Sequence, residues 1–310
     1  MELQSPHTAV LGKAPRHPEF VRYNAASPLA RYLLRWLEDG TGRLHAARSS
    51  LEGAPTCFVF TAPGEKTALV GVLTPSTDSI GRAFPLALFQ EVPTATVAGR
   101  YALLPEAFQP FFLAATRLVR EAASLELEAL QARAQELPSV SAADTRVAER
   151  VREVLLAEPR CDELLRNASG GGSPEVRYYA LHTFLTACAG ERQRERDLAS
   201  VVLDCPFPAH MGPVLWLELS ARLLRWSAAP PSFFWSEGEQ PRLLLCLGAA
   251  PSTLLLHLAQ PGRASANLWP LRTERPAALA RAKQALSPAQ RRVIDSPSST
   301  LENLLRAFAQ

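Results

Sequence analysis

Two short apolar runs enclose a polar loop in the first third of the chain. The first run covers 69–73, the loop covers 74–82 and the second run covers 83–89. Short apolar runs bounded by turn-forming residues are typical of buried strands. Within the loop, Pro75 restricts one φ angle and Gly81 can adopt a positive φ angle. The pattern therefore predicts a strand, a shaped loop and a second strand.

Further strands and helices follow from the same patterns. Ser27 before Pro28 is a helix start with a capping residue, and we expect Gly40 to end that helix. Pro105 opens a long helical region that 137–139 ends, and Ser141 with Asp144 resembles a capping box. Short apolar runs predict the other strands, at 10–11, 57–60, 97–103, 232–235 and 242–247. The remainder of the chain to its end is predicted to be mainly helical.

The strands are nearly continuous in apolar residues, which is typical of a sheet buried on both faces. We therefore expect an α/β fold: a layered α/β/α sandwich in which helices cover both faces of a mixed sheet, followed by a helical C-terminal tail. A boundary near residue 138 would separate residues 1–138 from a C-terminal α/β region at 139–310. Whether this second region extends the sheet of the first is left open.

Composition indicates a globular protein and narrows its partners. The chain has 310 residues, of which 47% are hydrophobic and 20% charged, and its net charge of +3 is too small to indicate a nucleic acid or an anionic membrane. Five cysteines without a Cys-x-x-Cys spacing fit reduced thiols. The first 20 residues lack the apolar segment of a signal peptide, and the apolar stretch 243–259 is interrupted and short of a membrane span. We expect a cytoplasmic protein without membrane insertion.

The usual signatures of chemistry are missing from the sequence. The glycines at 170–172 lack the spacing and the lysine of a phosphate-binding loop, and no Gly-x-Ser-x-Gly elbow is present. The histidines show no metal-ligand spacing with one another or with cysteine. We therefore predict no catalytic residue, no metal site and no cofactor.

The best candidates for a functional role lie in the polar loop. Asp78, with Ser76 beside it, could act as a base, and Arg82 could anchor an anion. We favour the interpretation that Asp78 accepts backbone N–H groups and Arg82 braces the loop, since a single carboxylate without a partner rarely catalyses. Trp235 with Glu237 could form a binding edge, or a turn whose tryptophan fills the core.

Three segments together carry a family resemblance. Residues 71–86 read Gly-Val-Leu-Thr-Pro-Ser-Thr-Asp-Ser-Ile-Gly-Arg-Ala-Phe-Pro-Leu, and this stretch resembles the central motif of the TagF/ImpM family of type VI secretion systems. Leu11-Gly12-Lys13-Ala14-Pro15 followed by Glu19-Phe20-Val21-Arg22 resembles the family's opening motif, and 233–238 resembles its Trp-Trp-Thr-Glu-Gly segment. Glu19 replaces the usual Asp, and Phe234 replaces a frequent Trp. The resemblance adds Lys13 and Glu19 to the candidate partner-binding or loop-structuring residues, and it makes 1–138 a TagF N-terminal-like domain.

The resemblance also implies a function. Proteins of this family are post-translational repressors of type VI secretion, which bind a forkhead-associated scaffold protein and withhold it from assembly. No phosphosite is evident in this sequence, so we expect an interface independent of phosphorylation. One alternative is a longin- or roadblock-like module that binds a small GTPase, and a less favoured one is a hydrolase centred on Asp78.

Overall fold

The structure is a computed structural model, and it describes residues 7–158, 165, 175–192, 200–208, 211–224 and 230–309. The glycines at 170–172 lie outside these residues. Within the described part of the chain, we find no helix whose length and hydrophobicity would suit a membrane span.

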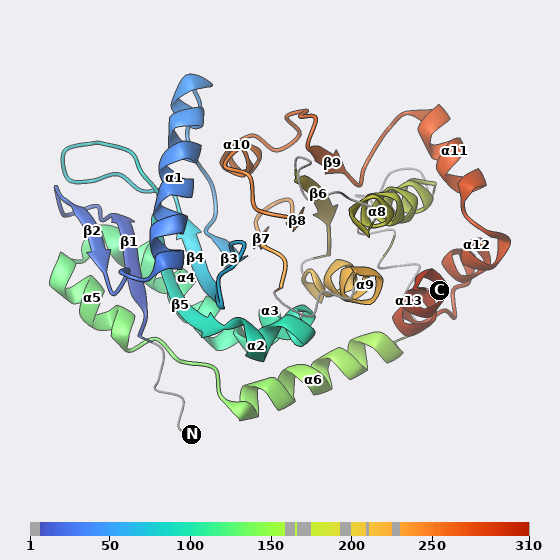
Figure 1. The fold of residues 1–310 in the computed structure, drawn as a ribbon, viewed down its shortest axis with the longest axis horizontal. Helices are drawn as coiled ribbons and strands as arrows, with labels where there is room; N and C mark the ends of the chain where they lie inside the picture. Colours follow the sequence, from blue (N-terminus) through green and yellow to red (C-terminus); the bar gives the residue numbers. More distant parts are fainter. Residues whose placement is uncertain are drawn as a thin grey trace.

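Nine strands of the described residues form a single sheet that runs across the molecule from β2 to β9 (Figure 1). Their order is β2-β1-β5-β4-β3-β7-β8-β6-β9. Neighbours are antiparallel except β6 and β9, which are parallel, so the sheet is mixed. The strands are β1 (Ala9–Lys13), β2 (Phe20–Tyr23), β3 (Thr56–Phe60), β4 (Thr67–Thr74), β5 (Leu86–Pro93), β6 (Val201–Pro206), β7 (Phe233–Ser236), β8 (Arg242–Leu247) and β9 (Leu268–Pro270).

Helices cover both faces of this sheet, which confirms the predicted α/β fold. They are α1 (Pro28–Ala46), α2 (Thr94–Val97), η1 (Ala98–Leu103), α3 (Leu104–Ala107), α4 (Gln109–Glu121), η2 (Ala122–Ser124), α5 (Leu127–Gln135), α6 (Ala142–Ala157), α8 (Val176–Arg192), α9 (Val214–Leu224), α10 (Leu254–Ala259), α11 (Pro276–Ala285), α12 (Pro288–Asp295) and α13 (Leu301–Phe308). The three last helices form the expected helical tail.

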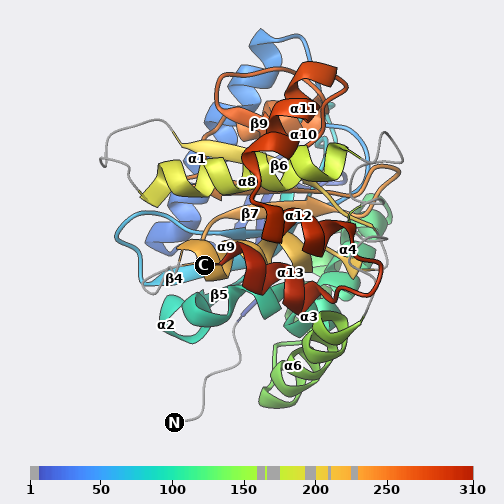
Figure 2. The same ribbon diagram turned by 90° about the vertical axis from the view of Figure 1, so that its right-hand side faces the viewer.

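Alternate residues of the strands enter two separate hydrophobic cores. Phe58 packs in the core beneath α1 and α10, whereas its neighbour Val59 packs in the core that contains α3, α4, α8, α9 and α13. This follows from the period of two in a strand, which sends consecutive side chains to opposite faces. Figure 2, turned by 90°, shows α8 and the tail helices stacked on the side of the molecule that faces the viewer.

The predicted strand–loop–strand unit is confirmed. β4 and β5 are antiparallel over their full length, with Thr67 opposite Pro93 and Thr74 opposite Leu86. Gly71 has a specific role in this pair: a Cβ atom there would lie 2.5 Å from the Leu88 carbonyl oxygen, so only glycine fits.

Two of the local predictions are wrong. Residues 97–103 are helical rather than a fourth strand, and the chain turns at Thr94, whose backbone N–H donates to the Lys66 carbonyl (2.9 Å). Gly40 does not end α1, which continues to Ala46. A Cβ at Gly40 would lie 2.3 Å from Leu255 Cδ1, so this glycine allows α10 to pack closely against α1.

Candidate functional site at one end of the sheet

The directions of the strands bring the motif segments to one end of the sheet. β1 and β4 are both antiparallel to β5, and β4 and β7 are both antiparallel to β3, so β1, β4 and β7 all point the same way. Their last residues, Lys13, Thr74 and Ser236, therefore lie at the same end of the sheet. We call this the motif end; it comprises residues 13–19, 49–55, 74–85 and 236–241.

The Asp78 carboxylate is the centre of the motif end. Its Oδ2 atom forms ion pairs with the ammonium of Lys13 and with Arg82 Nε (2.7 Å). Its Oδ1 atom accepts hydrogen bonds from the backbone N–H of Ile80 (3.2 Å) and of Arg82 (2.8 Å). The Asp78 side chain is fully buried, whereas 55% of the Arg82 side chain is exposed. We call Lys13, Asp78 and Arg82 the clasp.

Further hydrogen bonds tie the loop to the turn between β1 and β2. The Ser76 hydroxyl donates to the Lys13 carbonyl oxygen (2.7 Å), and the Arg82 guanidinium donates to the Pro18 carbonyl. Within the loop, the Phe84 N–H donates to the Ser76 carbonyl (3.0 Å). Three of the predicted residues (Ser76, Asp78 and Arg82) thus meet Lys13 in one connected group.

These contacts determine the ionisation of Asp78. Desolvation raises its pKa, but the hydrogen bonds from Lys13, from the Arg82 backbone and guanidinium, and from Ile80 together hold that pKa well below its ordinary range. A carboxylate with so low a pKa is a weak proton acceptor at neutral pH. Its hydrogen-bonding partners are two cations and two backbone amides, so the geometry suits a structural carboxylate better than a general base.

The other three predicted residues lie apart from the clasp. Trp235 is buried in the core, where its ring packs edge-on against that of Phe112 with 4.8 Å between the ring centroids. Glu237 directly follows β7 and is exposed. The pKa of Glu106 is raised mainly by the burial of Glu106 itself and secondly by the charge of Glu237. Glu19 is exposed immediately before β2. Glu19 and Glu237 are therefore at the motif end but outside the clasp.

Two adjoining hollows open at the motif end. One, of about 380 Å³, lies between the end of α1 and the loop at 75–85. The other, of about 450 Å³, is lined by Ser236, Gly238 and Arg242. They share Leu51, Glu52 and Pro75 in their walls. Two motif segments that are far apart in the sequence thus border two hollows with shared wall residues.

Sequence reasoning missed Ile80, which lies at the tip of the loop with 65% of its surface exposed. An isoleucine between Ser79 and Gly81, in the middle of a polar loop, is the signal that could have identified it. A single apolar residue in a loop can be buried or exposed, so the sequence alone does not distinguish a buried Ile80 from an exposed one.

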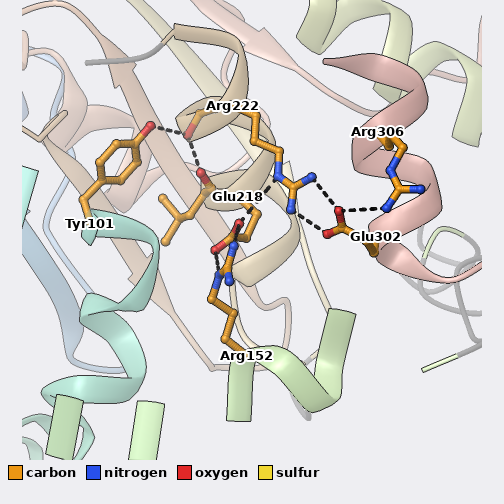
Figure 3. Close-up of polar contacts among 8 residues, drawn as sticks. Tyr101, Arg152, Glu218, Arg222, Glu302 and Arg306 are labelled. Atoms are coloured by element: carbon orange, nitrogen blue, oxygen red, sulfur yellow. Dashed lines mark hydrogen bonds and ion pairs between the residues drawn. The ribbon is translucent and has the colours of Figure 1, made fainter. Parts of the chain in front are cut away.

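A second polar cluster joins the helical tail to the body of the protein (Figure 3). Glu218 of α9 is 3% exposed and forms a two-pronged ion pair with Arg152 of α6, whose Nη2 lies 2.8 Å from Oε2. On the same helix, Arg222 forms a two-pronged pair with Glu302 of α13 at 2.6 and 3.1 Å. These residues link α6, α9 and α13, and every member faces another protein group, so we assign the cluster a structural role.

In the part of the chain that the structure describes, no three His, Cys, Asp or Glu side chains are grouped so that they could hold a metal ion. Cys57, Cys205 and Cys246 are free thiols.

Comparison with known proteins agrees with the motifs. No curated protein matches the chain. Among solved structures, the crystal structure of PA0076 from Pseudomonas aeruginosa PAO1 is similar, with 19% identity, coverage of 85% of this chain and 98% of that chain, and a TM-score of 0.49. Residues 9–137 match the family model of the TagF N-terminal domain, described as type VI secretion system-associated. Residues 9–137 are therefore similar to the TagF N-terminal domain, which is a type VI secretion system-associated domain.

Proposed function

We propose that this protein is a non-catalytic, cytoplasmic regulator of type VI secretion that binds a forkhead-associated scaffold protein and withholds it from assembly of the apparatus. The TagF N-terminal domain supports the secretion context. The observation that carries the proposal is the motif end, where motif segments distant in the sequence are fastened to one another around a buried carboxylate.

The chemistry of the clasp favours a binding surface over an active site. All of the polar atoms of Asp78 face groups that hold the loop in shape, and its low pKa makes it a poor base. A loop fixed in this way loses little conformational entropy when a partner binds, which favours recognition. The hydrolase centred on Asp78 is therefore the weaker candidate.

Repression would follow from mass action. Each scaffold molecule bound by this protein is withdrawn from the pool available for assembly, so the free scaffold falls as the regulator accumulates. No covalent step and no cofactor is needed. The interface we propose does not require phosphorylation of either protein.

The direct test uses the full-length chain and the forkhead-associated protein of the same secretion system, both purified without a kinase. We expect isothermal titration calorimetry to give a saturable complex, and we expect a phosphothreonine peptide not to displace it. Overproduction of the regulator should lower secretion. Absence of a complex at micromolar concentrations of both proteins would overturn the proposal.

A further inference from the structure

A third hollow, of about 570 Å³, lies at the end of β5 that is opposite the motif end. It is larger than either hollow of the motif end and within the range of about 300–1,000 Å³ that is typical of small-molecule sites. Its wall consists of residues from 90–108 and from 139–149, where α6 runs beside α3 (Figure 1). We call it the α3–α6 cavity. It therefore lies between the part of the chain that matches the family model and the part that follows it.

The wall of the α3–α6 cavity is mainly apolar, and its charges balance. The charged side chains that line it are two carboxylates and two guanidinium groups: Glu91, Glu149, Arg100 and Arg146. Arg100 Nη1 forms an ion pair with Glu149 Oε1 (2.9 Å), and both side chains are largely exposed, so this pair lies at the surface. The apolar part of the wall includes Val92, Val97, Leu104, Ala107, Phe108 and Val140. A molecule that matches this wall is uncharged and mainly apolar.

The wall also contains a buried amide with an unused acceptor. Gln90 and Val92 are two residues apart in β5, so their side chains lie on the same face of the sheet, and both line the cavity. The Nε2 atom of Gln90 donates to Thr8 Oγ1 (3.2 Å) and to the Pro138 carbonyl (3.1 Å). Its Oε1 atom is buried and accepts no hydrogen bond from the described residues. Because buried polar atoms nearly always have a partner, this oxygen points to a donor on a bound molecule.

We propose that the α3–α6 cavity binds a small, uncharged, mainly apolar molecule, which donates one N–H or O–H hydrogen bond to Gln90 Oε1. The site is separate from the motif end, and it does not depend on the proposed function. Because its wall comes from both sides of residue 138, a bound molecule contacts β5 and α3 together with the start of α6. Binding should therefore stabilise the position of α6 against the rest of the protein.

Two matched pairs of probes test the hydrogen bond: indole with 1-methylindole, and 2-naphthol with 2-methoxynaphthalene. The members of each pair share their rings, and methylation removes the donor. With the full-length chain, we expect calorimetric titrations to give saturable binding, and the Kd of indole and of 2-naphthol to be about threefold to tenfold lower than that of the methylated compound. Gln90→Leu removes the acceptor and should abolish this difference. Thermal melting should show that the variant folds.

Two tryptophan variants test the location of the site. Val140→Trp adds a large ring to the half-buried wall and should abolish binding, whereas Leu113→Trp, at an exposed position of α4 outside the cavity, should leave each Kd unchanged. In the wild-type chain, bound indole should slow hydrogen exchange at 139–149 and leave 74–85 unaffected. The site is wrong if no probe binds saturably at millimolar concentrations, or if exchange at 139–149 does not respond. Equal Kd values within both pairs would overturn the role of Gln90.

Discussion

The ammonium group of Lys13 forms an ion pair with the carboxylate of Asp78, although 65 residues separate the two in the sequence. Lys13 ends β1 and Asp78 follows β4, and β5 lies between these strands in the sheet. The pair therefore passes over the start of β5. It connects the opening motif of the chain with the central one, which explains why both segments are needed to build the motif end.

The stability of the protein should depend on the ionisation of Asp78. Its pKa is lower in the folded protein than its ordinary value of 3.8, so the clasp contributes its full stability above about pH 3.8 and loses it as the pH falls further. We expect Asp78→Asn to be less stable than wild type at neutral pH, and the difference to shrink below this pH. Urea unfolding from neutral to acidic pH measures this, with Asp39→Asn at an exposed position of α1 as the control. A difference that stays constant with pH would contradict the clasp.

Gly12 should tolerate no side chain, because it combines two constraints. Its φ angle is +117°, and a Cβ atom would lie 1.9 Å from the Pro85 carbonyl oxygen. Gly12→Ala should therefore destabilise the protein by at least about 2 kcal/mol, from overpacking together with backbone strain. Gly64→Ala provides the matched control, because Gly64 has a φ angle of +81° but open space around it, and should cost only about 1 kcal/mol. Equal losses in chemical denaturation would show that close packing against Pro85 is unimportant.

Removal of the Glu218 carboxylate should loosen the packing of α6 against α9. Glu218→Gln leaves the Arg152 guanidinium without its charged partner, and we expect the free energy of unfolding to fall by about 1–3 kcal/mol. This loss is smaller than for a fully buried pair because the Arg152 side chain is 30% exposed. Glu302→Gln, at a more exposed position, should cost less than about 1 kcal/mol. Hydrogen exchange of α6 and α13 together with denaturant unfolding tests the order of the two effects. A larger loss for Glu302→Gln would contradict it.

Trp235 should behave as a core residue, although the motif that contains it suggested a binding edge. Trp235→Ala removes a buried ring that packs against Phe112, and we expect a loss of about 3–5 kcal/mol. Trp235→Phe should lose less stability and keep the wild-type affinity for the partner. A Phe variant that folds normally and binds the partner more weakly would instead place Trp235 in the interface.

Many of the local elements could be predicted from the sequence, since their signals lie within a few neighbouring residues. Ser27 caps α1 as predicted, with its side chain accepting from the Ala30 N–H (3.1 Å), and Ser141 with Asp144 forms the predicted capping box. The polar loop between two apolar strands was also predicted correctly from the sequence. The helical segment at 97–103 could not be predicted, because a short apolar pattern fits both the helical and the strand period. Its packing against the core decided that it is helical.

How these elements meet depends on contacts that only the folded chain makes. β3 pairs with β7, with Cys57 opposite Trp235, and so strands from both sides of residue 138 join in one sheet. Strand order and direction bring Lys13 to Asp78, and the folded loop leaves Ile80 exposed. Such pairings depend on contacts between distant segments, which no local period specifies, and burial of Asp78 becomes favourable only once both cations are in place.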